Sequence, residues 1–495
     1  MGIIQSRHWK AIAFFIGLSQ TIFVRCRAKT IAPYYLVKGK PLVDSFNHSY
    51  HSKTFFFHPW YSTYHLPQMN SKLFQQIRIL DPVSNTDRIA DVLIIDSKIA
   101  AVETQISEFP TKTEIQNSHG LILGPGLVDL YSHSGEPGFE ERETIESLIQ
   151  AATAGGFTRL AILPDTFPPV DNPAGLARLQ NLAKNYASTP IIYYWGAITQ
   201  GLQGEQMTEL GELATTGVVG FADGLPLQNL GLLRRILEYL KPLNKPLALC
   251  CNNSRLAGKG VMREGYDSIR LGLPGVPTMA ETSALAAVLE LVDAIGTPVH
   301  IMRVSTARSV ELIRVAKNRG LPITASTTWM HLLLDTQAME GKSPFETEFF
   351  PYDTNLRLEP PLGNSSDRLA LVQGIKDGVL DAIAIEHAPF CYEEKTVTFY
   401  EAPPGTIGLE IALPLLWQNF VQTGKLSALD LWRVLSTAPS KCLGLSPGEV
   451  RPQKSAEVTL FGPQETWVVE KQTLKSRSIN TPWLGKQIQG RVLEV

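Results

Sequence analysis

The chain has 495 residues, of which 44% are apolar and 19% are charged, with 38 Gly and 33 Pro. This is the composition of an ordinary globular protein, and it excludes collagen-like, coiled-coil and largely disordered chains. The formal net charge of -2 gives no global field that would attract nucleic acid or a membrane surface, so we expect neither as a partner. The five cysteines are odd in number and two of them are adjacent, which is typical of a reduced cytoplasmic protein.

The first 68 residues differ in charge from the rest, because they hold eight Lys or Arg and one acid. Residues 11–24 form a mostly apolar run, which is shorter than the roughly 20 residues of a membrane-spanning helix. A signal peptide needs small residues at its cleavage site, whereas RCRAK follows this run. We therefore expect residues 1–70 to be a poorly structured extension, with a membrane anchor as the alternative and Met69 as an alternative start.

Strand patterns lie on both sides of a long central region. LFQQIRIL, ADVLIID and KIAAVET follow Met69, and AEVTLFG and TWVVE follow residue 446. Each group alone is too small to enclose a hydrophobic core. We therefore expect residues 71–124 and 446–495 to form one composite β domain.

In the central region, short apolar strand patterns alternate with amphipathic helix patterns. The eight expected strands are 127–133, 159–165, 191–198, 218–223, 246–252, 298–305, 322–328 and 382–389. The expected helices include 143–154, 226–241, 279–295, 307–318 and 366–377. Eight strand–helix units predict an α/β fold, a (β/α)8 TIM barrel over residues 125–445, with its chemistry at the C-terminal ends of the strands.

The first strand ends in Tyr131-Ser132-His133, and alternate residues of a strand share one face. His133 could therefore bind a metal ion, whereas a tyrosine with a pKa of about 10 is a poor ligand at neutral pH. A zinc site needs three or four ligands together. A single histidine at a strand end is more often a hydrogen-bonded structural residue.

Further polar side chains end the later strands. Cys250 is either a zinc ligand or a buried apolar filler, and Asp223 and Glu386 are suited either to acid–base work or to ion pairs. Arg303 ends the sixth strand, and a guanidinium carries the positive charge that a metal would bring and binds carboxylates well. We expect Arg303 to pair with Glu386 or Asp223, which would make a metal unnecessary.

The segment GPGLVDLYSHSGEPGFEERETIESLIQAATAGGFT resembles the opening barrel motif of dihydroorotases, in the amidohydrolase superfamily. The resemblance continues through PDTFPPVDNPAG, GFADGLP, LGLPGVPTMAE, HIMRVSTARSVELIRVAK, TNLRLEPPLG, AIEHAPF, PPGTIGLE and SINTPWLGKQIQGRV, over about 71–495. It implies a barrel of the metal-dependent hydrolase type with a composite β domain. The family's reaction is the reversible, metal-dependent cyclisation of N-carbamoyl-L-aspartate to dihydroorotate in pyrimidine biosynthesis, in which a metal-bound hydroxide attacks the cyclic amide.

By this resemblance, three histidine positions of the family's metal site fall on Tyr131, Cys250 and Arg303, while His133 is kept. The family's two consecutive aspartates are reduced to one, Asp223. The ligands that remain for any zinc ion are therefore His133, Asp223 and Cys250.

The positions for substrate and proton transfer are also altered. The catalytic Asp of the family falls on Glu386. The Arg, Asn and His that hold the substrate fall on Gly135, Asp165 and Phe390. We expect Asp165 to repel the carboxylate of dihydroorotate, so that the scaffold is kept and the chemistry is lost.

The resulting hypothesis is that the protein is a dihydroorotase homologue that has lost its activity, a pseudoenzyme, and that it binds no cofactor. We expect it to be cytoplasmic and oligomeric, and to act as a structural partner of, for example, aspartate carbamoyltransferase or an intact dihydroorotase. The first alternative is an active dihydroorotase or related cyclic amidase that hydrolyses dihydroorotate to N-carbamoyl-L-aspartate with one zinc ion. That ion would be held by His133, Asp223, Cys250 and Glu386. The second alternative is a binding protein whose barrel mouth holds another small ligand.

Overall fold

The computed structural model describes residues 70–495, except for 187–189 and 346. The extension or membrane anchor expected before residue 70 therefore lies outside the described residues. Within the described part, none of the helices combines the length and the apolar character that crossing a membrane requires.

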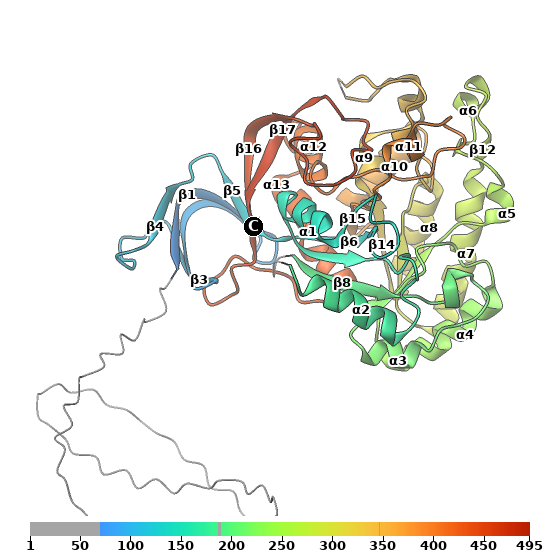
Figure 1. Ribbon diagram of the computed structural model, residues 1–495, viewed down its shortest axis with the longest axis horizontal. Helices are drawn as coiled ribbons and strands as arrows, with labels where there is room; N and C mark the ends of the chain where they lie inside the picture. Colours follow the sequence, from blue (N-terminus) through green and yellow to red (C-terminus); the bar gives the residue numbers. More distant parts are fainter. Residues whose placement is uncertain (1–69, 187–189, 346) are drawn as a thin grey trace, which may run out of the picture. The chain divides into compact units, whose positions relative to one another are not determined.

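A parallel sheet of eight strands forms the centre of the fold (Figure 1). In spatial order its strands are β6 (Leu127–Ser132), β7 (Phe157–Ile162), β8 (Ile191–Gly196), β9 (Gly220–Phe221), β10 (Leu247–Cys250), β13 (Val299–Met302), β14 (Ile323–Thr328) and β15 (Ala382–Ala384). Each predicted strand overlaps one of these, so the (β/α)8 barrel is confirmed. The observed strands are shorter than the predicted ones, most clearly β9, for which the predicted range was 218–223.

Hydrogen bonds at the strand ends join the first and last strands of the barrel. The backbone N–H of Ile385 donates to Oδ1 of Asp129 at 2.8 Å, and the N–H of His133 donates to the carbonyl of His387 at 2.9 Å. Asp129 is fully buried, and this burial raises its pKa to about 7. The carboxyl group of Asp129 therefore helps to hold β6 beside β15.

Helices cover the outside of the barrel. The longer ones are α1 (Ile145–Ala154), α2 (Pro173–Ala183), α4 (Leu230–Leu240), α7 (Thr278–Ile295), α8 (Ala307–Asn318), α10 (Ser365–Lys376) and α13 (Ala428–Leu435). The shorter ones are α3 (Leu210–Thr215), α5 (Ser254–Ala257), α6 (Tyr266–Arg270), α9 (Trp329–Leu333), α11 (Tyr392–Lys395), α12 (Ala412–Leu416) and α14 (Thr437–Cys442). In α1, Thr144 accepts a hydrogen bond from the N–H of Ser147 as an N-cap. The apolar side chains of Ile145, Leu148, Ile149 and Ala152 in this helix are buried. All five helix ranges predicted from periodicity are helical.

A second sheet takes strands from both sides of the barrel sequence. Its strands are β17 (Gln487–Glu494), β16 (Val458–Val468), β5 (Ile122–Pro125), β1 (Ser71–Asp81), β2 (Thr86–Ile95), β3 (Lys98–Glu103) and β4 (Glu114–Asn117), the last beside β1. In β16, AEVTLFG and the start of TWVVE join into one strand with register shifts against β17. A two-stranded ribbon, β11 (Met262–Arg263) and β12 (Gly275–Val276), follows β10 in the barrel.

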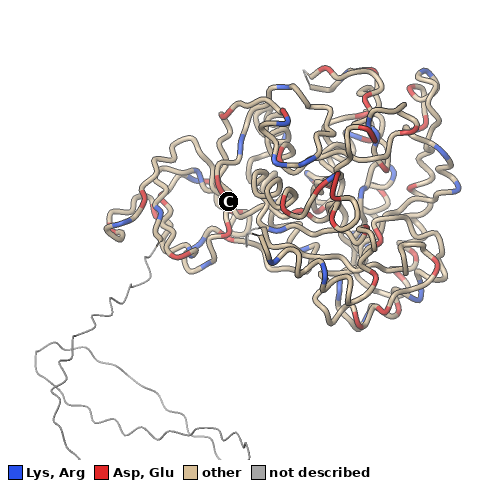
Figure 2. The backbone as a smooth tube through the Cα atoms, in the orientation of Figure 1, with Lys and Arg blue, Asp and Glu red and all other residues tan. Residues whose placement is uncertain are grey.

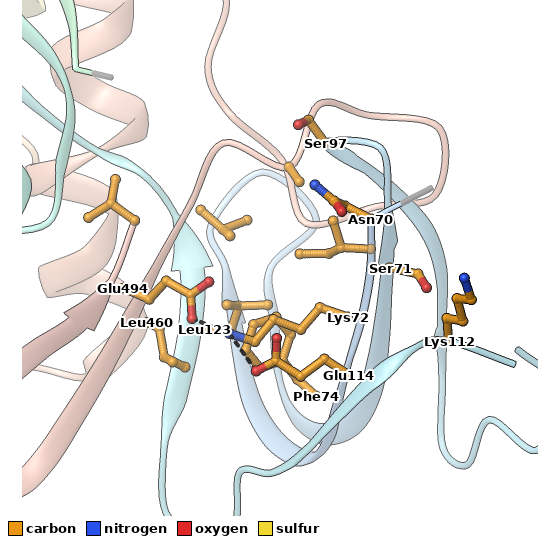
Figure 3. A pocket seen from close by; sticks show the side chains of 14 residues that line it. Asn70, Ser71, Lys72, Phe74, Ser97, Lys112, Glu114, Leu123, Leu460 and Glu494 are labelled. Carbon is orange, nitrogen blue, oxygen red and sulfur yellow. Dashed lines mark hydrogen bonds and ion pairs between the residues drawn. The ribbon is translucent and has the colours of Figure 1, made fainter. Parts of the chain in front are cut away.

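Two surface features complete the fold. A cavity of about 530 Å³ lies against the second sheet, where Lys72 forms ion pairs with Glu114 and Glu494 (Figure 3). Basic and acidic residues are interspersed over the backbone of the described part (Figure 2). This mixed distribution agrees with the small net charge of the sequence.

Candidate functional site

A cavity of about 330 Å³ lies at the C-terminal ends of the barrel strands. Five of the residues singled out from the sequence line it: His133, Asp165, Asp223, Arg303 and Glu386. Most of the remaining wall is apolar. We call this cavity the barrel mouth.

An ion pair between Arg303 and Glu386, one of the two pairings expected for this arginine, lies at the barrel mouth. The Nε of Arg303 is paired with Oε1 of Glu386, without the geometry of a hydrogen bond, and Nη1 donates to the carbonyl of Gly224 at 2.8 Å. Arg303 and Glu386 have φ angles of 55° and 50°, which residues other than glycine seldom adopt. Backbone strain of this kind is typical of functional sites, where the surrounding structure must hold it in place.

The Arg303 side chain is only 5% exposed and that of Glu386 15%, so their charges depend on each other. Burial is the largest effect on the pKa of Arg303 and lowers it, but Glu386, Cys250 and Tyr131 together outweigh burial and raise the pKa above the ordinary value. Burial raises the pKa of Glu386, and the guanidinium acts against that rise. The barrel mouth therefore contains a fixed positive charge.

Tyr131 lies beside Arg303 and is fully buried. Its hydroxyl is 2.8 Å from Oγ of Ser326 and accepts a hydrogen bond from the N–H of Arg303 at 3.2 Å. Burial raises the pKa of Tyr131 above its ordinary value. The phenol therefore stays protonated and hydrogen-bonded, which suits a structural role better than metal binding.

Two of the candidate zinc ligands, Cys250 and Asp223, are a neutral thiol and a carboxylate bound by the protein itself. Burial raises the pKa of Cys250 to about 11, so its thiol is protonated at neutral pH. Asp223 directs its carboxylate to the loop after β8: Oδ1 accepts from the N–H groups of Ile198 (2.7 Å) and Thr199 (3.0 Å), and Oδ2 accepts from Oγ1 of Thr199 (2.6 Å). Asp223 thus holds that loop in place.

These contacts test whether the residues present fit a zinc ion. Such a site needs three or four converging ligands, with cysteine as thiolate. His133, Asp223 and Cys250 do not converge in this way, and no group of three or more His, Cys, Asp or Glu side chains in the described residues could hold a metal. The donor chemistry of the barrel mouth, with a guanidinium in its midst, does not fit zinc.

His133 is paired with Asp165 across the mouth, with Nδ1 and Oδ2 2.5 Å apart. Burial is the largest effect on the pKa of His133 and lowers it, but the charge and hydrogen bond of Asp165, together with the charge of Glu386, outweigh burial and raise the pKa. Burial is likewise the largest effect on the pKa of Asp165 and raises it, but the charge and hydrogen bond of His133, together with the charge of Arg303, outweigh burial and lower the pKa. The negative charge that Asp165 brings to the mouth is therefore paired with His133.

Several known proteins are similar to this chain in sequence. Residues 120–309 match the family described as dihydro-orotase-like. A probable dihydroorotase-like protein of Synechocystis sp. is 46% identical over 445 residues, covering 86% of this chain and 99% of that protein. The dihydroorotase of Syntrophus aciditrophicus is 37% identical over 417 residues, covering 84% and 95%. The chain belongs to the dihydroorotase family.

Solved structures agree with this assignment at the level of the fold. L-hydantoinase from Arthrobacter aurescens superposes with a TM-score of 0.74 at 20% sequence identity, covering 86% of this chain and 95% of that one. D-hydantoinase from Thermus sp. gives a TM-score of 0.70, also at 20% identity. The fold is an amidohydrolase TIM barrel with a β domain.

Two positions that the dihydroorotase family resemblance assigns to substrate binding, Gly135 and Phe390, do not line the mouth. A Cβ on Gly135 would lie 2.3 Å from the carbonyl oxygen of Glu143 and 2.5 Å from that of Phe139, so this loop has no room for a side chain. The N–H of Phe390 donates to Oδ1 of Asn480 at 3.1 Å. We therefore assign structural roles to both residues.

A Gly135→Ala variant is expected to lower the free energy of unfolding by about 3 kcal/mol, at the upper end of overpacking costs, because the clash is with backbone atoms. Urea denaturation measures the change. The matched control is Gly231→Ala in α4, where the nearest atom to the new Cβ is 3.4 Å away and alanine favours the helix. Equal stability of Gly135→Ala and wild type would contradict the crowding.

An Asp165→Asn variant is expected to show pH-dependent destabilisation. The lowered pKa of Asp165 stabilises the folded protein fully above about pH 3.9, and this stabilisation is lost as the pH falls through the pKa of the folded state. The raised pKa of His133 stabilises the folded protein fully below about pH 6.5, and that stabilisation is lost as the pH rises through the pKa of the folded state. The difference from wild type should therefore be largest between about pH 4 and 6.5. Urea titrations across this range check it, and a difference independent of pH would contradict it.

Sequence reasoning missed Glu359 and His331, which also line the mouth. The Nδ2 of Asn252 donates to Oε1 of Glu359 at 3.0 Å. Nδ1 of His331 is 2.7 Å from Oγ1 of Thr328, and burial lowers the pKa of His331 to about 4, so the ring is neutral. The only sequence signal for Glu359 is an acid before two prolines in TNLRLEPPLG, because the loop that carries it matches no strand end.

Proposed function

We propose that this member of the dihydroorotase family does not hydrolyse dihydroorotate and serves instead as a structural partner in pyrimidine biosynthesis. The buried pair of Arg303 and Glu386 carries the proposal. The family's reaction needs a metal-activated water, and a buried guanidinium with a raised pKa repels a metal cation. Glu386, at the position of the catalytic Asp, is engaged by Arg303 rather than free to move a proton.

The substrate side of the mouth supports the same conclusion. Gly135 and Phe390, at two substrate positions of the family, lie outside the cavity wall. Asp165, at the third, is bound to His133. The groups that would orient the carboxylate of dihydroorotate are therefore missing from these three positions.

The partner role is supported by what the chain keeps. The scaffold aligns with 95% of the Syntrophus aciditrophicus dihydroorotase, although the chemistry of the mouth has changed. A kept fold without its reaction suits a role in assembly, and we propose aspartate carbamoyltransferase or an intact dihydroorotase as the partner in an oligomer. The four cysteines of the described part are free thiols, which supports a cytoplasmic site.

Genetic complementation tests the proposal. A bacterial strain without dihydroorotase, carrying this gene, is expected not to grow unless pyrimidine is added, whereas the same strain carrying the Syntrophus aciditrophicus dihydroorotase is expected to grow. Growth of the first strain without pyrimidine would overturn the proposal. Affinity purification from the native cell tests the partner role, and recovery without either enzyme would contradict that part.

The second candidate is an active dihydroorotase with a reduced zinc site. The observation that favours it is the 37% identity with proteins named dihydroorotase over most of both chains. It requires zinc held by His133, Asp223, Cys250 and Glu386, so that Arg303 would have to leave Glu386. Growth in the complementation assay that is lost in a Glu386→Gln variant would favour this candidate.

A further inference from the structure

A chain of hydrogen bonds runs through the barrel to the mouth. The N–H of Arg303 donates to the hydroxyl of Tyr131 at 3.2 Å, and this hydroxyl lies 2.8 Å from Oγ of Ser326. Oγ of Ser326 is 2.8 Å from Nε2 of His300, and Nδ1 of His300 is 2.9 Å from Oγ1 of Thr324. Thr324 lines a separate cavity of about 430 Å³ at the start of β10, β13 and β14. The chain therefore connects the two ends of the barrel.

The protons of this chain have one arrangement that satisfies every group. A backbone N–H can only donate, so the oxygen of Tyr131 accepts from Arg303. Tyr131 and Ser326 are fully buried, and within the described residues their hydroxyls have no partners outside the chain. Both hydroxyl protons therefore find acceptors only if Tyr131 donates to Ser326 and Ser326 donates to Nε2 of His300.

This arrangement fixes the tautomer of His300. Burial lowers the pKa of His300 to about 3, so at neutral pH the ring carries a single proton. With Nε2 accepting from Ser326, that proton lies on Nδ1 and is donated to Oγ1 of Thr324. In His331 it is Nε2 that lies 3.1 Å from a carbonyl, that of Pro360, and a carbonyl only accepts. The two buried rings therefore hold opposite tautomers.

Tyr131 holds Arg303 through both its backbone and its side chain. The φ angle of 55° at Arg303 costs free energy in a residue other than glycine, and the N–H of that residue is bound by the Tyr131 hydroxyl. The guanidinium lies over the Tyr131 ring, 5.7 Å from its centroid, which is within the range of a cation–π contact. A fixed phenol therefore fixes the direction of Arg303 towards Glu386.

We propose that His300 is a positioning residue for the barrel mouth. As the Nδ1–H tautomer, it accepts from Ser326, and Ser326 in turn accepts from Tyr131. Tyr131 then presents its oxygen to the N–H of Arg303, which keeps the guanidinium beside Glu386. The inference rests on the proposed function, in which Arg303 takes the place of a metal, and deepens it by naming the residues that keep Arg303 there.

NMR spectroscopy of the full wild-type chain, with isotope-labelled histidine, tests the tautomer. Long-range proton–nitrogen spectra distinguish a ring nitrogen that carries a proton from one that does not. His300 is expected to carry its proton on Nδ1 and His331 on Nε2, without titration between about pH 5 and 8. A His300→Asn variant assigns the signal by its loss. If no ring that fails to titrate carries its proton on Nδ1, the inference is overturned, whether or not that variant folds.

A Tyr131→Phe variant tests the link between His300 and Arg303. It keeps the ring and removes the hydroxyl that orders the chain, so Ser326 can either donate to His300 or accept from it. His300 is then expected to populate both tautomers. The amide hydrogen of Arg303 is expected to exchange with solvent up to about tenfold faster, the effect of losing one hydrogen bond.

The matched control is Tyr194→Phe. It removes a buried hydroxyl outside the chain, which donates to the carbonyl of Leu179 at 3.3 Å, and it is expected to leave the His300 tautomer and the Arg303 exchange rate unchanged. A Tyr131→Phe protein that behaves like this control in both measurements would refute the link.

The tautomer is measured without any activity, which separates this inference from the proposed function. Growth in the complementation assay would refute the proposed function and leave the tautomer of His300 as it is. A proton on Nε2 of His300 together with absence of growth would refute only the positioning role.

Discussion

An Arg303→Met variant is expected to lose about 3–5 kcal/mol of unfolding free energy near neutral pH, because it leaves Glu386 buried without its partner. In the native protein the two side chains are 5% and 15% exposed, so solvent would do little to compensate. Urea denaturation followed by circular dichroism measures the loss. Methionine keeps most of the side-chain length, so the main change is the charge.

The pH dependence of this variant has a definite sign. Burial already raises the pKa of Glu386, and without Arg303 only desolvation and neighbouring charges remain. An acid with a raised folded pKa destabilises the fold above its unfolded pKa of about 4.3, and the penalty disappears as the pH falls below that value. The deficit of Arg303→Met should therefore shrink towards about pH 4.

The matched control removes both partners. An Arg303→Met, Glu386→Leu double variant is expected to recover most of the loss, since replacing both members of a buried ion pair by apolar side chains is often neutral or stabilising. If the single variant were as stable as wild type, the pair would not be buried as described. If the double variant were as unstable as the single one, packing rather than charge would be the cause.

The second large effect concerns activity. Purified protein supplied with zinc is expected to hydrolyse dihydroorotate no faster than buffer, because bound zinc lowers the pKa of water from 15.7 to about 7 and this mouth has no donor set that fits zinc. The Syntrophus aciditrophicus dihydroorotase, assayed beside it, is expected to be at least about 10⁶-fold faster, the lower end of typical enzymatic enhancements. Hydrolysis is followed by the loss of dihydroorotate absorbance.

A contaminating enzyme is the main risk in that assay, and Glu386→Gln controls for it. Turnover that is equal in wild type and Glu386→Gln comes from another protein. Saturable turnover by the wild type that a chelator abolishes and Glu386→Gln lacks would contradict the account.

The sequence predicted the barrel well because its strands and helices alternate with clear periodicity, and because successive barrel strands along the chain are neighbours in the sheet. It also predicted that Arg303 pairs with Glu386 or Asp223, because a guanidinium binds carboxylates well, and the structure places it on Glu386. The single strand β16 was less predictable, because register shifts interrupt the alternation between AEVTLFG and TWVVE.

The remaining site residues depend on loops that periodicity does not describe. Asp223 is held by Ile198 and Thr199, which lie in the loop after another strand. The space around Gly135 is filled by the backbone of Phe139 and Glu143, which folds back over it. Neither arrangement has a pattern in the sequence, so both positions could be named but not placed.

Zinc content of the purified protein tests the central claim most directly. Five of the ten histidines precede residue 69 and could bind zinc unspecifically, so the full chain and a His133→Ala variant are saturated with zinc, dialysed together and compared by elemental analysis. With Arg303 filling the mouth, the two proteins should retain the same amount of zinc. About one more zinc ion per chain in the wild type would show that the mouth binds metal and would contradict the account.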